Sequence, residues 1–254
     1  MTWDPTQYAR YSNHRSRPFF DLVAQIGAVA PRSVIDVGCG SGELTVTLAQ
    51  RWPEAALRGV DFSPEMIARA PADQGVNFSV QDAQHLDAVD VDVLVSNAAL
   101  QWVPQHQDLL GRWAGQLNKD GWLAFQVPAN FDAPSHRLMR ELADSPRWRD
   151  RLQGVLRSAL TVAEPDRYLD LMTAHGLRAD VWQTQYLHVL QGDDPVLEWV
   201  RGTGLRPVLA TLTDDEAKEF SDEYAAALQR AYPRRPYGTV FPFLRTFVVA
   251  HKRP

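Results

Sequence analysis

The chain has 254 residues, of which 45% are hydrophobic, enough for one α/β domain with insertions or two small domains. Its formal net charge of −5 argues against nucleic-acid binding as the main activity, and its single cysteine excludes a disulfide framework or a zinc cluster. The start has no secretory signal and no apolar run approaches the length of a membrane span. We therefore expect a cytoplasmic protein with no membrane, nucleic-acid or obligate protein partner and no bound metal.

Residues 1–30 join an aromatic and basic start to a predicted helix over about 18–29. The apolar residues of this helix recur on one face at helical spacing: Phe19, Leu22, Val23 and Ile26. The aromatic and basic start could lie over a ligand as a lid or pack on the surface, and the pattern leaves both interpretations open.

A short apolar strand at 33–37 runs directly into a glycine-rich turn and then a helical pattern. Glycines allow unusual dihedral angles, and a helix start offers unpaired N–H groups, so this segment predicts a polar ligand site. The spacing differs from the dinucleotide fingerprint because Glu43 stands where that pattern needs Gly or Ala. Asp36, on the strand before the turn, suits a cationic ligand group. The turn glycines are Gly38, Gly40 and Gly42.

The next three predicted strands also end in polar residues. Strand 57–60 ends at Asp61, and a carboxylate about twenty residues after a glycine turn usually accepts from ribose hydroxyls. Phe62 could then lie against an adenine ring. Strand 76–80 precedes Asp82 and Ala83, which could pair with the adenine edge, and strand 91–95 precedes Asn97. Ligands of doubly wound sheets bind at the carboxyl ends of strands, so these motifs predict one site.

The remaining chain alternates helices and strands up to a last strand at 241–252, expected to form an antiparallel edge. The pattern predicts a three-layer, doubly wound, Rossmann-like α/β sheet, mostly parallel with an antiparallel terminal strand, plus a helical cap. We expect one domain over 1–254. Its parts are an N-terminal lid and helix at 1–30, a cofactor-binding core at 31–130, cap segments at 134–160 and 194–232, and final strands at 177–191 and 240–252.

The four strand-end motifs together closely resemble those of class I S-adenosylmethionine-dependent methyltransferases, over about residues 30–130. The resemblance implies S-adenosylmethionine as cofactor and S-adenosylhomocysteine as product. By the same resemblance, the backbone of Gly38, Gly40 and Gly42 runs past the methionine part of the cofactor, and Asp36 helps to hold its ammonium group. Asp61 holds the ribose, and Asp82 with Ala83 holds the adenine. Asn97 lies beside the methionine moiety through its backbone carbonyl.

The flanking motifs look like those of trans-aconitate 2-methyltransferases, nearly from end to end. They are the N-terminal pattern Trp3-Asp4-Pro5, Tyr8, Tyr11, Arg15 and Arg17-Pro18, then Ser96-Asn97-Ala98-Ala99-Leu100-Gln101-Trp102, Trp199-Val200-Arg201-Gly202-Thr203-Gly204-Leu205, and Phe241-Pro242-Phe243 with Arg245 and Phe247. This resemblance implies methylation of a carboxylate of trans-aconitate to a monomethyl ester.

A carboxylate with a pKa near 4 is already ionised at neutral pH, so we expect no catalytic base. The other carboxylates of a tricarboxylic acid need cationic or hydrogen-bonding partners, and arginine suits them. The candidates for substrate binding are Arg245 and Arg206, assisted by Tyr237, Thr203 and Trp102. Tyr11 and Arg15 could instead hold the cofactor carboxylate from the N-terminal lid.

Three alternatives remain. The chain could methylate another small or carrier-bound acid, although its acidic balance shows no basic docking face for an acidic carrier. A nucleic-acid methyltransferase is disfavoured because Ser-Asn-Ala-Ala follows the fourth strand, without an Asn/Asp-Pro-Pro-aromatic motif. A non-catalytic cofactor-binding module is disfavoured by the intact glycines and carboxylates.

Overall fold

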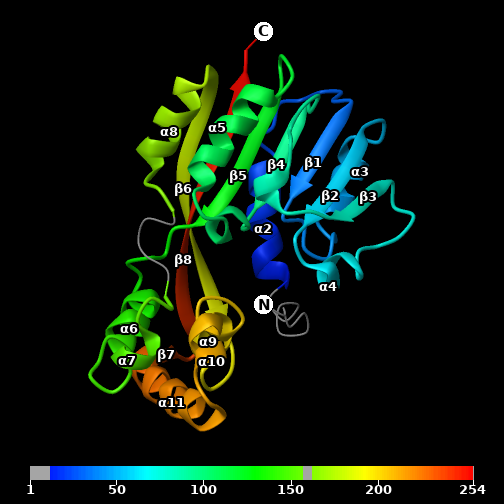
Figure 1. The fold of residues 1–254 in the computed structure, drawn as a ribbon. Helices are drawn as coiled ribbons and strands as arrows, with labels where there is room; N and C mark the ends of the chain where they lie inside the picture. The colour runs from blue at the N-terminus through cyan, green and yellow to red at the C-terminus, as the bar shows by residue number, and fades with distance from the viewer. Residues whose placement is uncertain (1–11, 157–161, 254) are drawn as a thin grey trace.

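The computed structural model describes the backbone of residues 12–156 and 162–253, with side chains from Ser16 onward. The described strands form one eight-stranded sheet in the order β3-β2-β1-β4-β5-β8-β6, with β7 paired to β8 (Figure 1). Strands β1 to β5 are parallel, and β8 is antiparallel to both β5 and β6. The strands are β1 (Ser33–Val37), β2 (Ala56–Asp61), β3 (Val76–Val80), β4 (Val93–Asn97), β5 (Trp122–Pro128), β6 (Leu177–Leu190), β7 (Arg234–Arg235) and β8 (Gly238–Lys252).

The predicted fold class is confirmed, but the expectation that the last strand forms an edge is wrong. Strand β8 lies between β5 and β6, so β6 is the edge. The burial of Phe247, Val248, Val249 and Ala250 explains this placement, because a strand covered on both faces is apolar at every position. Strand β6 instead alternates buried and exposed residues along its last half.

Helices cover both faces of the sheet. The described helices are α2 (Ser12–Val23), α3 (Thr45–Arg51), α4 (Pro64–Ile67), α5 (His106–Gln116), α6 (Pro134–Ala143), α7 (Arg149–Leu152), α8 (Pro165–Ala174), α9 (Pro195–Arg201), α10 (Arg206–Thr211) and α11 (Asp214–Ala231), with short 3₁₀ turns η1 (Ala83–His85) and η2 (Leu100–Trp102). Apolar side chains of α2 and α3 pack on one face, and those of α5 and α8 pack on the other.

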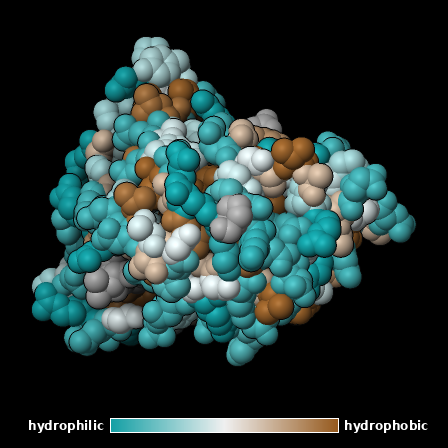
Figure 2. Space-filling model, turned by 90° about the horizontal axis from the view of Figure 1, so that it is seen from above, coloured by the Kyte–Doolittle hydropathy of each residue, from teal (hydrophilic) through white to brown (hydrophobic). Residues whose placement is uncertain are grey.

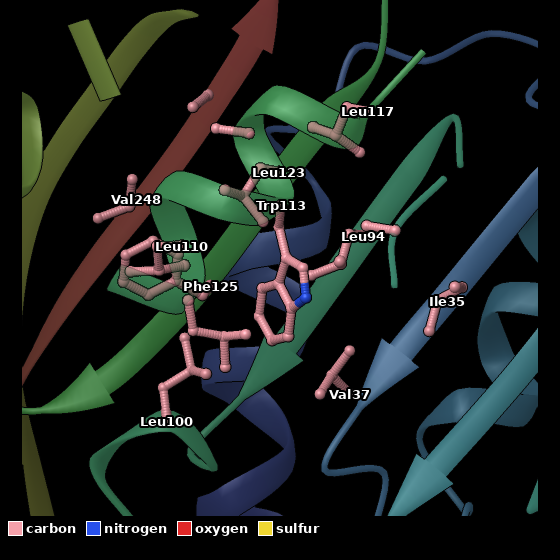
Figure 3. Packing of buried hydrophobic residues seen from close by; sticks show 14 of the residues in the cluster. Ile35, Val37, Leu94, Leu100, Leu110, Trp113, Leu117, Leu123, Phe125 and Val248 are labelled. Carbon is pink, nitrogen blue, oxygen red and sulfur yellow. The ribbon is translucent and has the colours of Figure 1, made fainter. Parts of the chain in front are cut away.

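Successive side chains of the buried strands point to opposite faces of the sheet, so each strand contributes apolar residues to both faces. On β4, Val93 and Val95 face α2 and α3, while Leu94 faces α5 and α8. Figure 3 shows Trp113 of α5 near Leu94 and Phe125, and its Nε1–H is satisfied by the Leu86 carbonyl oxygen at 3.0 Å. The sheet is therefore packed on both faces, and the ends of its parallel strands lie along one edge.

Helix α2 ends earlier than the pattern predicts. The carbonyl oxygens of Val23 and Ile26 accept hydrogen bonds from the Arg51 guanidinium, both at 2.7 Å. The Arg51 side chain of α3 thus satisfies carbonyl groups that a longer α2 would satisfy within the helix. Gly27 comes directly after this segment.

A second body of helices packs on the far halves of β6 and β8. Helices α6, α7, α9, α10 and α11 gather at the end of this strand pair away from β1 to β5 (Figure 1). They share a hydrophobic cluster that includes Trp148, Phe220, Phe241 and Phe243. We call this body the cap, and its residues come from both segments, 134–160 and 194–232, that the sequence pattern marked as helical.

No helix in the described part of the chain is long and apolar enough to cross a membrane. On the face seen in Figure 2, hydrophobic residues form small groups within a mostly hydrophilic surface. Among residues 12–156 and 162–253, no group of three His, Cys, Asp or Glu side chains is arranged to hold a metal ion.

Asn130 ties the end of β5 to the middle of β8. Its Nδ2 donates to the Leu244 carbonyl oxygen at 2.9 Å, and the Leu244 N–H donates to its Oδ1 at 2.8 Å. Through these two hydrogen bonds the Asn130 amide takes the place of a backbone partner for Leu244, just beyond the end of β5. Asn130 is 5% exposed, so both bonds are buried. This contact fixes the point where the sheet continues into the cap.

We expect Asn130→Ala to lower the free energy of unfolding by about 1–3 kcal/mol, because it leaves the Leu244 N–H unsatisfied. Urea unfolding of the two chains measures this difference. The matched control is Asn77→Ala on β3, an exposed asparagine, which should change stability by less than about 0.5 kcal/mol. Equal losses in both variants would contradict the assigned role of Asn130.

Candidate active site

The glycine turn after β1 is held against the end of β2. The Gly38 and Cys39 N–H groups both donate to the Val60 carbonyl oxygen, at 2.8 and 3.1 Å. Gly38, Gly40 and Gly42 have φ values of +76°, +58° and +75°, in the left-handed region that favours glycine. A Cβ on Gly38 would lie 2.2 Å from the Ala99 Cβ, whereas a Cβ on Gly40 would meet no atom within 4 Å. The turn therefore packs closely on one side and leaves open space above Gly40.

Asp61 at the end of β2 organises the same turn. Its Oδ2 accepts from the Gly40 N–H and its Oδ1 from the Ser63 N–H, both at 2.9 Å. Burial raises the pKa of Asp61, against the opposing effect of these backbone donors. Each carboxylate oxygen can accept a further hydrogen bond, so the group suits a diol such as ribose.

Asp36 is a buried carboxylate that is only partly satisfied. The Thr45 hydroxyl donates to its Oδ2 at 2.6 Å, but its Oδ1 has no hydrogen-bond partner among the described residues. Burial raises the pKa of Asp36 to about 7, with the Thr45 hydrogen bond lowering it and the nearby Asp61 charge raising it further. An unsatisfied buried oxygen beneath the glycine turn fits a cationic group, such as the ammonium of S-adenosylmethionine.

Phe62, Asp82 and Ala83 follow the paired strands β2 and β3. Phe62 is 54% exposed, so its ring is available to a flat apolar ligand group. Asp82 caps η1 by accepting from the Gln84 N–H at 2.8 Å, and it lies 3.9 Å from His85 Nδ1. Ala83 is the first residue of η1 and is partly buried.

Asn97 and Arg245, predicted for different ligands, belong to one hydrogen-bonded chain. Arg245 Nη1 donates to Gln126 Oε1 at 3.0 Å, and Gln126 Nε2 donates to Asn97 Oδ1 at 2.7 Å. Gln126 and Arg245 are 1% and 4% exposed. Asn97 ends β4, and Ala98 after it has a φ of +54°, uncommon for a residue other than glycine.

A cavity of about 810 Å³ lies between these strand ends and the cap. Its wall includes Asn97, Trp102, Thr203 and Arg245, so three of the five predicted substrate residues share it with one predicted cofactor residue. Arg245 also lies over the Phe243 ring, with its Cζ 4.7 Å from the ring centroid. The wall thus joins a buried positive charge to aromatic and amide groups.

The other predicted residues lie elsewhere. Arg206 is the first residue of α10 and is partly buried, and it is not part of the described wall. Tyr237 is 54% exposed, and its hydroxyl accepts from Arg235 Nη1 at 2.9 Å. Tyr11 lies outside the described residues, and Arg15 lies on α2 with its side chain outside them.

The sequence analysis did not identify Gln126 or Asn130. Gln126 lies on β5, between Asn97 on β4 and Arg245 on β8, and Asn130 follows β5 and bonds Leu244 on β8. A signal was present for Gln126, since it is the one polar residue in the otherwise apolar run Trp122-Leu123-Ala124-Phe125-Gln126-Val127. Buried polar side chains are normally hydrogen-bonded, so such a residue predicts a partner. No local pattern names that partner, because Arg245 is 119 residues away along the chain.

The raised pKa of Asp36 predicts a pH-dependent stability. An unfolded aspartate has a pKa of about 3.9, so between about pH 4 and pH 7 the folded chain holds a proton that the unfolded chain lacks. The free energy of unfolding should therefore fall as the pH rises through this window. Asp36→Asn should remove this loss, with a stability gain over the unaltered chain that grows from pH 4 to 7, on the order of 1.4 kcal/mol per pKa unit.

Urea unfolding between pH 4 and 8, without cofactor, measures this effect. The control is Asp170→Asn, which removes an exposed carboxylate of α8 and is measured over the same pH range. A constant difference between Asp36→Asn and the unaltered chain across the window would show that folding does not shift the pKa of Asp36.

Comparison with known proteins agrees with this geometry. A family model described as a methyltransferase domain matches residues 11–186. A solved structure, the YcgJ protein of Bacillus subtilis, has the same fold at 16% identity, with a TM-score of 0.58 over 95% of this chain and 99% of that one.

Two curated relatives match almost the whole chain. The trans-aconitate 2-methyltransferase of Streptomyces avermitilis is 52% identical over 99% of this chain and 97% of its own length. The trans-aconitate 2-methyltransferase of Streptomyces coelicolor is 54% identical over 99% of this chain and 87% of its own length. With this identity over nearly the full length of each chain, and with a methyltransferase sheet beneath the glycine turn, the chain belongs to the trans-aconitate 2-methyltransferase family.

Proposed function

We propose that this chain transfers a methyl group from S-adenosylmethionine to a carboxylate oxygen of trans-aconitate, giving a monomethyl ester and S-adenosylhomocysteine. The buried Arg245 guanidinium on the wall of the 810 Å³ cavity carries the proposal, because it is a permanent positive charge beside the predicted cofactor site. The names of the full-length relatives supply the choice of acid. From the sequence we further expect the enzyme to act in the cytoplasm without an obligate protein partner.

When bound, S-adenosylmethionine supplies an electrophilic methyl group on a sulfonium. The open space above Gly40 and the unsatisfied Asp36 Oδ1 fit its methionine part, and the remaining acceptor positions of Asp61 fit its ribose. The residues proposed to hold it are Tyr11, Arg15, Asp36, Gly38, Gly40, Gly42, Asp61, Phe62, Asp82, Ala83 and Asn97.

The chemistry asks the protein for alignment. The attacking carboxylate is ionised at neutral pH, so no side chain has to remove a proton. Holding two reactants in line can supply about 7–11 kcal/mol in well-oriented systems. Arg245 would fix one carboxylate of the acid, with Trp102 and Thr203 on the same wall, while Arg206 and Tyr237 stay predicted contributors.

Labelled S-adenosylmethionine and a panel of di- and tricarboxylic acids test the proposal directly. We expect a trans-aconitate monomethyl ester, identified by mass spectrometry, at a rate well above those for cis-aconitate and citrate. Cofactor binding without transfer to any panel acid would leave the methyltransferase fold in place and contradict the choice of substrate.

Two substitutions should separate cofactor binding from substrate binding. Asp61→Ala should weaken S-adenosylhomocysteine binding in calorimetry, because it removes the ribose acceptor and the hydrogen-bond acceptor of the Gly40 N–H.

Arg245→Met should raise the KM for trans-aconitate about tenfold or more and leave the cofactor affinity nearly unchanged. The loss of one contact worth about 1.4 kcal/mol weakens binding tenfold. Arg137→Met, on an exposed arginine of α6, is the control. Unaltered kinetics of Arg245→Met would remove Arg245 from the substrate site.

A further inference from the structure

The hydrogen-bonded chain from Arg245 through Gln126 to Asn97 has a fixed direction. An arginine guanidinium has only donors, so the atom of Gln126 that faces Arg245 Nη1 must be the acceptor Oε1. The opposite atom of the same amide, Nε2, is a donor and must therefore face the acceptor of Asn97, which is Oδ1. The positive charge on β8 thus sets the orientation of an amide on β4, two strands away.

This direction decides what Asn97 presents to the cavity. With Oδ1 turned to Gln126, the Nδ2 donors of the Asn97 amide are directed away from Gln126 and are available to a ligand. Asn97 lines the cavity, and within residues 12–156 and 162–253 its Nδ2 makes no hydrogen bond. The positive charge of Arg245 and the amide donor of Asn97 therefore lie on the same wall of the cavity, linked through the Gln126 amide.

We propose that Asn97 Nδ2 binds a carboxylate of the acceptor substrate, and that Gln126 is a positioning residue that holds Asn97 in its donor orientation. The inference rests on the proposed function and deepens it, because it adds a side-chain contact to a residue otherwise expected to act through its backbone. A carboxylate accepts up to four hydrogen bonds, so it can use this amide together with a positively charged neighbour.

Topology favours the substrate over the cofactor as the source of this carboxylate. The glycine turn follows β1, whereas the Asn97–Gln126–Arg245 chain runs from β4 across β5 to β8, away from that turn. The same wall continues into the cap at Thr203, between α9 and α10. The contact therefore lies on the side of the cavity that the cap closes.

Asn97→Asp tests the assignment with almost no change of shape. The introduced carboxylate can still accept from Gln126 Nε2, but it turns an oxygen instead of an NH₂ group to the cavity. We expect the KM for trans-aconitate to rise about ten- to a hundredfold, the range for one hydrogen bond to a charged group. Calorimetry of trans-aconitate binding to the chain saturated with S-adenosylhomocysteine should show the same loss, while the Kd of S-adenosylhomocysteine changes by less than about threefold.

Gln126→Met tests the positioning role. It keeps the side-chain length but frees the Asn97 amide to rotate, so trans-aconitate binding should weaken while S-adenosylhomocysteine binding stays near normal. The control is Gln116→Met on α5, whose amide bonds Ala88 N–H and Asp87 far from the cavity and whose loss should leave both affinities unchanged. Equal effects of the two glutamine variants would reduce Gln126 to a structural residue.

The remaining outcomes are also decisive. Unchanged trans-aconitate binding in Asn97→Asp overturns the assignment, and so does a loss confined to S-adenosylhomocysteine, which would place the amide on the cofactor carboxylate. Failure of the unaltered chain to bind trans-aconitate would count against the proposed function alone. The Asn97→Asp comparison is then made with whichever panel acid the unaltered chain does bind.

Discussion

The pairing of β6 with β8 is the constraint on which the rest of the structure depends. It runs without interruption from Leu177 opposite Lys252 to Leu190 opposite Thr239. One half of the pair completes the sheet beside β5, and the other half carries the cap helices (Figure 1). Because the cap helices pack on the far half of this pair, the pairing of β6 with β8 places the cap beside the strand ends that line the cavity. Arg245 lies close to the point where β5 stops and the cap begins, opposite Pro128.

Several polar groups buried at this junction are hydrogen-bonded to one another. Gln126 joins Arg245 to Asn97, and Asn130 closes the backbone of Leu244. Buried polar groups cost free energy unless they are paired, so such pairs also fix the orientation of each member. Asp36 departs from this rule among the described residues, since one oxygen lacks a partner and burial raises its pKa. An unsatisfied carboxylate at the base of a glycine turn suits a cationic ligand group.

The two halves of the sheet carry different groups, and methyl transfer needs both of them. The ends of β1, β2 and β3 provide glycines, carboxylates and an aromatic ring suited to the parts of S-adenosylmethionine, and the wall from β4 to β8 provides a cation and amides suited to a carboxylic acid. An ionised carboxylate needs no base, so the site needs rigid placement more than acid–base chemistry. The ends of β1 to β3 and the wall from β4 to β8 belong to one hydrogen-bonded sheet, which holds the two groups of residues in place relative to each other.

The sequence by itself determined the features that depend on neighbouring residues. The glycine turn, the strand-end residues Asp36, Asp61 and Asp82, and the α/β class follow from local periodicity and turn chemistry, and the structure has them where the pattern predicts. The tertiary structure alone decided that β8 is interior and that Gln126 links Asn97 to Arg245. It also separated Arg245, on the cavity wall, from Arg206 and Tyr237, which lie off its described lining. Sequence spacing could not decide these points, because strand order and register depend on contacts between residues more than a hundred positions apart.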